Sequence, residues 1–368
     1  MSEPVLRRTQ AGLAAGLLCA PVFRVQSPLA RALSLCGLLS VMSFAAVPAC
    51  AQANAEASAA AGYSVPSDLA QHTLLLDVAH AGKRLVSVGD RGHILYSDDN
   101  AATWAQAKVP TKQLLTAVFF VDDTYGWAVG HDAQILATQD GGKTWVTQFK
   151  DVEREEGSPF LDVWFKDRDT GFVVGAYGAL LMTSDGGKNW EDIGDRLNSD
   201  EGYHLNAIVA VKDAGLFIVG ELGGMFRSAD WGQTWEAVKG PYEGSLFGAL
   251  GTHEAGTLLV YGLRGHLFRS SDFGDTWERI ELNTPNNGPL EFGLADGNLL
   301  QDGSIVVVGH GGSVLKSTDG GRTFDLINRR DRLSLAGVAA LDNGNLILVG
   351  QGGVHVASPT GAELGQQR

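Results

Sequence analysis

Residues 138–145 read Thr138-Gln139-Asp140-Gly141-Gly142-Lys143-Thr144-Trp145, and variants of this phrase return five more times along the chain. We call the phrase the Asp motif; its aspartates are Asp99, Asp140, Asp185, Asp230, Asp272 and Asp319. Successive aspartates lie 41, 45, 45, 42 and 47 residues apart. A period in the forties is typical of radially repeated all-β folds.

A second phrase, Val-Gly or Tyr-Gly followed by two variable residues and usually another glycine, precedes each Asp motif. It occurs seven times, and its first glycines are Gly89, Gly130, Gly175, Gly220, Gly262, Gly309 and Gly350. The second glycine stands three residues later in every copy but one, where Ala133 replaces it. Glycines at this spacing between apolar strands predict tight hairpins whose backbone needs a positive φ.

Each repeat divides into four short strands, which in the second repeat are predicted at 115–121, 126–129, 134–138 and 144–149. The last repeat supplies only three, at 335–341, 346–349 and 354–358. Residues 63–67 resemble the outer strand at 107–111, so we expect an N-terminal strand to complete the last blade. The predicted fold is an all-β, seven-bladed β-propeller of four-stranded antiparallel blades over residues 62–358, followed by a tail at 359–368.

The six aspartates are predicted to be structural. Asp and Ser/Thr side chains accept hydrogen bonds from the backbone of their own turn, and glycine supplies its left-handed residue. The final Trp or Phe is expected to pack into the seam between neighbouring blades. Catalytic carboxylates occur once or twice in distinct environments, which a sixfold repeat does not provide.

Composition narrows the choice of partners and cofactors. The chain of 368 residues has 48 glycines and a net charge of −14, which disfavours nucleic acid and anionic membrane surfaces as partners. Its three cysteines, Cys19, Cys36 and Cys50, all precede the repeats, so no disulfide or thiolate metal site is expected there. We predict no cofactor, no metal and a monomer.

Residues 1–51 are predicted to be an export signal, because four arginines and an apolar run at 32–47 precede Ala49-Cys50-Ala51. Three outcomes stay open: simple cleavage, lipidation at Cys50, or retention as an N-terminal anchor. The apolar run is short for a membrane span. Residues 52–61 are expected to be a flexible spacer. Every outcome predicts an exported domain, in the periplasm or a compartment like the thylakoid lumen.

The Asp motifs resemble the Asp-box, or BNR, repeats of sialidases and other propellers. Together with the seven glycine hairpins and the leader, residues 62–358 look most like the photosystem II stability/assembly factor family. The resemblance implies a non-catalytic protein that binds extracytoplasmic parts of a membrane protein, either a photosystem II precursor or another complex such as a transporter. The alternative is a sialidase-like glycoside hydrolase, but the chain has no Arg-Ile-Pro segment and no evident acid/base pair.

The candidate binding residues lie in the hairpins and blade connections, which do not repeat and are expected to share one face. Arginines there could grip carboxylates bidentately, and the resemblance also leads us to look for an arginine patch. Solvated loop charges, and ordinary surface histidines rather than metal ligands, are the alternatives. The predicted residues are Arg91, Arg264, Arg329, Arg330, Arg332, His131, Tyr177 and His310.

Overall fold

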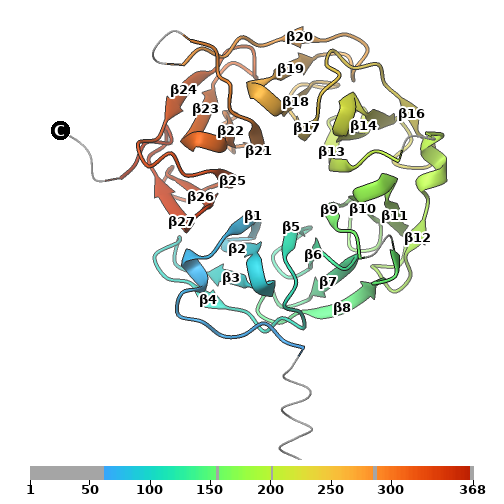
Figure 1. Cartoon of the computed structure of the whole chain (residues 1–368), viewed down its shortest axis with the longest axis vertical. Helices are drawn as coiled ribbons and strands as arrows, with labels where there is room; N and C mark the ends of the chain where they lie inside the picture. The colour runs from blue at the N-terminus through green and yellow to red at the C-terminus, as the bar shows by residue number, and fades with distance from the viewer. Residues whose placement is uncertain (1–61, 155–156, 200–201, 285–287, 365–368) are drawn as a thin grey trace, which may run out of the picture. The chain divides into compact units, whose positions relative to one another are not determined.

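Seven antiparallel sheets follow one another along the chain and are arranged in a ring (Figure 1). The computed structural model describes residues 62–364, apart from 155–156, 200–201 and 285–287. Six of these sheets have four strands and the seventh has three, so the predicted seven-bladed propeller is confirmed. The predicted leader at 1–51, with Cys50, and the spacer at 52–61 lie outside the described residues.

Each blade runs from an inner strand near the axis to an outer strand at the rim. The strands of blades 1 to 3 are β1 (Leu75–Ala81), β2 (Arg84–Gly89), β3 (Ile94–Ser97), β4 (Ala105–Gln106), β5 (Leu115–Phe120), β6 (Gly126–Gly130), β7 (Gln134–Thr138), β8 (Val146–Lys150), β9 (Phe160–Phe165), β10 (Gly171–Gly175), β11 (Leu180–Thr183) and β12 (Glu191–Asp192). Those of blades 4 and 5 are β13 (Leu205–Val211), β14 (Gly215–Gly220), β15 (Met225–Ser228), β16 (Glu236–Ala237), β17 (Leu246–Gly251), β18 (Leu258–Gly262), β19 (Leu267–Ser270) and β20 (Glu278–Arg279). Those of blades 6 and 7 are β21 (Leu294–Leu299), β22 (Ile305–Gly309), β23 (Ser313–Ser317), β24 (Asp325–Asn328), β25 (Leu335–Ala340), β26 (Leu346–Gly350) and β27 (Gly353–Ala357).

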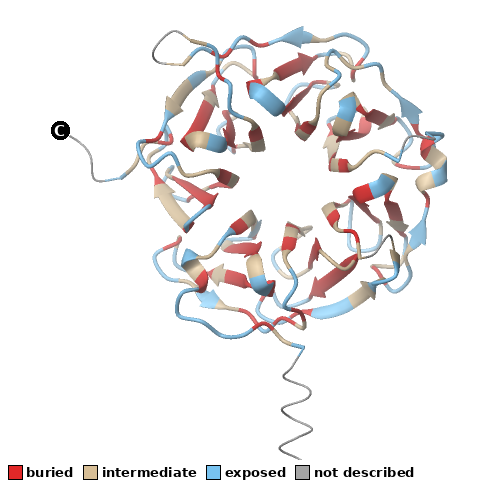
Figure 2. Cartoon of the chain, in the orientation of Figure 1, coloured by how far each residue is buried: buried red, intermediate tan, exposed pale blue. Residues whose placement is uncertain are grey.

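The middle strands of every blade are buried, while the outer strands face solvent (Figure 2). Strand β6, for example, is buried at every position, whereas Val146 in β8 is 63% exposed. The apolar clusters lie between neighbouring sheets: Trp127 of blade 2 stacks on Phe165 of blade 3, with ring centroids 3.4 Å apart. The core is therefore divided among the seams of the ring, and each blade depends on both neighbours for its burial.

The Asp motif closes the turn between the third and fourth strands through its own side chains. In the second copy, Asp140 accepts hydrogen bonds from the backbone N–H and the hydroxyl of Thr144, at 2.9 and 2.6 Å. Thr138 accepts one from the N–H of Gly142, whose φ of 87° suits glycine. The motif tryptophan packs into the seam, where Trp145 is 3% exposed and meets Phe120 edge-on.

The Asp motifs also connect the blades. The motif residue after the aspartate has a left-handed backbone, and a donor from the preceding blade reaches the carbonyl there in several copies. The pairs are Arg84 with Gly141 at 2.9 Å, Gln148 with Gly186 at 2.9 Å, Arg227 with Phe273 at 3.0 Å and Arg269 with Gly320 at 3.1 Å. Each turn is thus held from within and from the neighbouring blade.

The predicted closure of the last blade by an N-terminal strand is wrong. Instead of pairing with β27, the segment runs along the outer edge of blade 1, where the N–H of Ser64 donates to Val109 O at 2.9 Å. Gln106 in β4 binds the Ser64 hydroxyl and Val65 O, at 3.0 and 3.1 Å. The likeness between 63–67 and 107–111 arises because two similar extended segments lie beside each other.

The ring closes by packing between blades 7 and 1. Val78 and Leu85 of blade 1 share a buried cluster with Ala339, Ile347 and Val349 of blade 7. At the edge of this seam, the N–H of Asp342 donates to the side chain of Asn100, at 3.0 Å. This seam therefore resembles the other six, and its two sides come from opposite ends of the described chain.

Residues 358–363, which span the end of the predicted propeller and the start of the tail expected at 359–368, form a degenerate seventh copy of the Asp motif. The N–H of Ala362 donates to the Ser358 hydroxyl at 3.1 Å, the same bond that joins Gly321 to Ser317 in the sixth copy. Thr360 replaces the aspartate, and Gly361 has a φ of 90°. Lys316 of blade 6 donates to Pro359 O at 2.9 Å, so the link to the preceding blade is retained.

Candidate functional site

The turns between second and third strands lie at the opposite end of the strands from the Asp motifs, together with the connections between blades. We call this surface the hairpin face; its short turns surround the central axis in Figure 1. At each turn the second variable residue has a left-handed backbone. These residues, which we call the tips, are Arg91, Asp132, Tyr177, Leu222, Arg264, Gly311 and Gly352.

The residue after each tip also has a positive φ, as the sequence predicts. In several blades a side chain there would collide with the blade connection: a Cβ added to Gly92 would strike the carbonyl oxygen of Thr111, and one added to Gly223 would strike that of Tyr242. Ala133, the exception, has a φ of 43° and is fully buried. The glycine hairpins therefore hold the tips against the blade connections and fix their positions.

Four of the five predicted arginines are exposed on the hairpin face. Arg91 has a side chain that is 77% exposed and lies 3.4 Å from the Asp90 carboxylate. Arg264, Arg330 and Arg332 are also exposed. They belong to blade 5 and to the connection between blades 6 and 7, so with Arg91 they span neighbouring blades across the closing seam.

Arg329 lies inside the protein. Its side chain is 4% exposed, and its guanidinium pairs with Asp331 at 2.7 Å and reaches Gly361 O at 3.4 Å. It therefore anchors the degenerate seventh motif and cannot meet a partner on the surface. Its burial follows from the C-terminal turn, which the sequence did not reveal as a structural element.

The remaining predicted residues lie on different blades. Tyr177, the tip of blade 3, is 57% exposed, and its ring meets His204 edge-on with centroids 4.9 Å apart. His131 is half-buried in blade 2, and His310 is exposed in blade 6. Within the described ranges, no group of three or more His, Cys, Asp or Glu is arranged to hold a metal ion.

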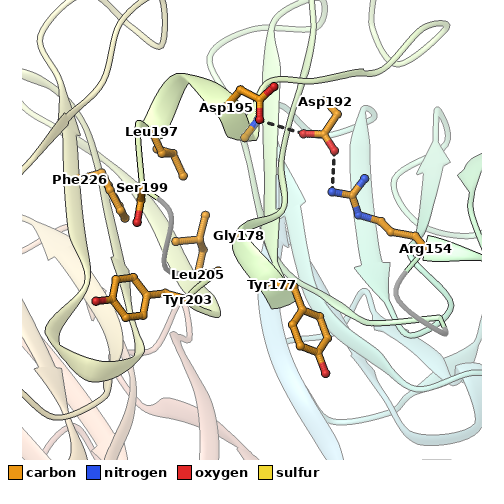
Figure 3. A pocket seen from close by; sticks show the side chains of 12 residues that line it. Arg154, Tyr177, Gly178, Asp192, Asp195, Leu197, Ser199, Tyr203, Leu205 and Phe226 are labelled. Carbon is orange, nitrogen blue, oxygen red and sulfur yellow. Dashed lines mark hydrogen bonds and ion pairs between the residues drawn. The ribbon is translucent and has the colours of Figure 1, made fainter. Parts of the chain in front are cut away.

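A pocket of about 380 Å³ opens beside Tyr177, between blades 3 and 4 (Figure 3). Arg154 and Asp192 form an ion pair at 2.6 Å on one side of it. Leu205 and Phe226 contribute apolar surface to its lining. This mixed lining suits a polypeptide side chain better than a free ion.

A central cavity of about 560 Å³, which was not predicted from the sequence, is lined by the inner strands of all seven blades. Three half-buried aspartates face it: Asp77 in β1, Asp162 in β9 and Asp296 in β21. A signal was present in the sequence, because each aspartate is the third residue of its inner strand and follows two apolar residues, as in Phe160-Leu161-Asp162-Val163.

Each of these carboxylates joins its own blade to the next. Asp162 accepts hydrogen bonds from the N–H groups of Val163, at 2.7 Å, and of Ile208 in blade 4, at 2.9 Å. Asp77 binds Val118 of blade 2 at 2.7 Å, and Asp296 binds Val338 of blade 7 at 2.9 Å. Their geometry is that of inter-blade bridges.

Burial in the cavity wall changes the titration of the three aspartates. Loss of hydration raises the pKa of Asp77 to about 6 and that of Asp162 to about 7, although the backbone hydrogen bonds act in the opposite direction. The pKa of Asp296 is raised well above its usual value by burial and by the nearby charge of Asp77.

Comparison with known proteins identifies the family. The sequence model of the photosynthesis system II assembly factor YCF48 family matches residues 95–158 and 146–284, just over half of the chain. The chain belongs to this family. A chloroplastic photosystem II stability/assembly factor, HCF136 of Cyanidioschyzon merolae, is 45% identical over 58 residues, which are 15% of this chain and 13% of that protein.

Solved structures agree with the YCF48-family fold. A structure described as YCF48 bound to D1 peptide has a TM-score of 0.61 and 19% identity, covering 78% of this chain and 92% of its own. A streptogramin B lyase structure has a TM-score of 0.63 and 11% identity, covering 79% of this chain and 95% of its own. At these identities the likeness concerns the fold alone, which both an assembly factor and an enzyme use.

Proposed function

We propose that this YCF48-family chain is an exported, non-catalytic binding protein that assists the assembly of a membrane protein complex. The hairpin face would capture an extracytoplasmic segment of the client protein. Membership of the YCF48 assembly factor family supports a role in assembly, and the similar structure described as YCF48 bound to D1 peptide supports a polypeptide ligand. A photosystem II precursor and an unrelated complex, such as a transporter, are both clients of the kind proposed.

The observation that carries the proposal is the grouping of exposed arginines on one face of an acidic protein. The chain has a net charge of −14, yet Arg91, Arg264, Arg330 and Arg332 are all exposed on the hairpin face. Guanidinium groups recognise carboxylates through paired hydrogen bonds. A segment carrying carboxylates therefore fits this face.

The proposal of a non-catalytic role rests on the state of the candidate carboxylates. The motif aspartates are bound within their turns, and the cavity aspartates accept backbone hydrogen bonds from two blades. Neither set leaves a free pair of carboxylates placed around a substrate bond. Among the described residues, no helix is long and apolar enough to cross a membrane. The proposal also places the domain in the periplasm or an equivalent compartment, because residues 1–51 have the pattern of an export signal.

The test is affinity capture from detergent-solubilised membranes, with the triple variant Arg91→Glu, Arg264→Glu and Arg330→Glu. We expect it to lose its membrane-protein partner while its melting temperature stays close to that of the unmodified protein. The matched control is Lys83→Glu, Lys143→Glu and Lys188→Glu, which makes the same charge change at exposed positions toward the Asp-motif face.

Undiminished capture by the arginine variant would overturn the assignment of the binding face. Loss of capture by the lysine control as well would show that the effect is one of overall charge. Turnover of sialosides or glucans by the unmodified protein would overturn the non-catalytic role and favour the glycoside hydrolase alternative.

A further inference from the structure

The tips on the hairpin face carry large side chains where the backbone favours glycine. Blades 6 and 7 have Gly311 and Gly352 at the tip, with φ of 65° and 81°. Blades 3 and 4 have Tyr177 and Leu222 at the same position, with φ of 55° and 53°. A bulky residue with this backbone is uncommon, and the conformation is strained.

Burial does not compensate for this strain at the two apolar tips. Tyr177 is 57% exposed and Leu222 is 64% exposed. A strained, exposed, apolar residue contributes nothing evident to the fold that glycine would not. Strain of this kind concentrates at binding sites, where the surrounding structure holds a side chain ready for a partner.

The two apolar tips belong to one continuous surface. The ring of Tyr177 contacts His204, and the His204 backbone N–H donates to the side chain of Glu221 at 3.2 Å. Glu221 directly precedes Leu222, so the contact runs from the tip of blade 3 to that of blade 4.

Apolar exposure continues on the next blades. Leu263 is 38% exposed beside the tip of blade 5, and Phe292 is 48% exposed in the connection that leads to blade 6. A Cβ added to Gly311 would lie 2.9 Å from the Phe292 ring, so this ring lies across the tip of blade 6. We call Tyr177, Leu222, Leu263 and Phe292 the apolar arc.

The apolar arc meets the arginines at blade 5. Leu263 and Arg264 are consecutive residues of one turn, and both are exposed. Beyond them, Arg330, Arg332 and Arg91 continue the basic surface across blades 6, 7 and 1. The exposed apolar residues of the hairpin face thus lie on blades 3 to 6, and the exposed arginines lie on blade 5, on the connection between blades 6 and 7 and on blade 1, so the two groups overlap at blades 5 and 6.

We propose that the hairpin face binds an extended polypeptide segment in which an apolar stretch directly adjoins a group of carboxylates. The apolar side chains would pack on Tyr177 and Leu222, and the carboxylates would pair with Arg264 and the arginines beyond it. A polypeptide fits this face better than a membrane surface because of charge. The net charge of −14 repels an anionic membrane, whereas a short acidic segment needs to contact only the local arginines. This inference rests on the proposed function and names the chemistry of its ligand.

The test uses Tyr177→Gly and Leu222→Gly, singly and together. Glycine relieves the backbone strain but has more freedom in the unfolded chain, and these effects nearly cancel, so the melting temperature should change little. Affinity for a short synthetic peptide with a leucine- and phenylalanine-rich half followed by aspartates should fall about ten-fold or more in the double variant. Val146→Thr, which removes an exposed apolar group from the outer strand β8, is the matched control and should bind normally.

Peptide controls separate the two parts of the face. Replacing the aspartates by asparagine should weaken binding to the unmodified protein, and replacing the apolar half by serine should weaken it similarly. A scrambled peptide that alternates the two residue types should bind less well than the block sequence.

Three outcomes would overturn the inference. One is full peptide affinity in the Tyr177→Gly, Leu222→Gly variant; another is binding to phosphatidylglycerol vesicles in place of the peptide. The third is normal capture of the membrane partner by the tip variant while the arginine variant loses it, which would leave the proposed function intact. Failure of both variants to affect capture would count against the proposed function as well.

Discussion

Left-handed backbone serves two purposes in this protein, and the place of the residue in the blade shows which one applies. In the Asp motifs it lets a turn fold back on its aspartate, as at Gly142, and the side chain of that aspartate completes the turn. On the hairpin face it presents side chains such as Tyr177 to solvent. The first use is structural, and the second is available for recognition.

Replacing a motif aspartate should destabilise the fold without affecting binding. Asp140→Ala removes the acceptor for the backbone N–H and hydroxyl of Thr144, so we expect a loss of about 1–2 kcal/mol. Urea unfolding would measure it, and peptide binding at the opposite face should stay unchanged. An unaltered unfolding midpoint would show that the turn does not need its aspartate.

Glycine patterns predicted the turns because positive φ excludes most other residues, and the structure agrees at Gly92 and Gly142. Exposure of individual arginines was not predictable in the same way. Arg329 and Arg330 are neighbours in the sequence, yet only Arg330 faces solvent, because a turn formed some thirty residues later covers Arg329. Local sequence carries no sign of such a distant contact.

Among the strands, the inner ones do more than line the axis. Asp77, Asp162 and Asp296 connect three pairs of blades through backbone N–H groups that the apolar inner strands leave available. Each aspartate follows two apolar residues at the start of its inner strand, a pattern that is visible in the sequence. The bridging role of the aspartate could not be predicted from this pattern, because its hydrogen-bond partner belongs to the following repeat.

These bridges predict an unusual dependence of stability on pH. The folded-state pKa of Asp162 is raised to about 7, so between its usual pKa near 4 and pH 7 the folded protein binds more protons than the unfolded chain. Stability from this group is therefore greatest at acid pH and falls as pH rises through 7. Asp77, with a pKa of about 6, acts in the same direction.

The variant Asp162→Asn isolates this effect. It loses one backbone hydrogen bond at every pH, but its free energy of unfolding should fall less steeply between pH 4.5 and pH 8 than that of the unmodified protein. His93, whose pKa is lowered by burial, changes stability in the opposite direction and cancels in the comparison. Parallel pH profiles for the two proteins would contradict the prediction.

For the whole molecule, the decisive feature is how the ring closes. The seven glycine hairpins predicted the number of blades, whereas the closing strand was misassigned because a resemblance between two segments does not show which sheet edge they join. Packing of Val78 and Leu85 against Ala339 and Ile347 closes the seam, and the degenerate motif at 358–363 supports blade 6 and blade 7.

Two deletions distinguish these modes of closure. Removing 358–368 uncovers Arg329 and breaks the links from Lys316 and Arg329, so we expect a fall in melting temperature of about 5 °C or more. Removing 62–67 breaks only edge contacts with blade 1 and should lower it by less. The opposite ranking, measured by thermal unfolding, would show that the N-terminal segment stabilises the ring more than the C-terminal turn does.

The seam between blades 7 and 1 also orders events during synthesis. Blade 1 is made first, but the apolar surface around Val78 finds its partners only when Ala339, Ile347 and Val349 have been added. A chain interrupted in the later blades would carry exposed apolar surface and an unpaired sheet face, the features that lead to aggregation and proteolysis. Completion of the last repeat is thus the step after which the protein can persist as a closed, folded ring.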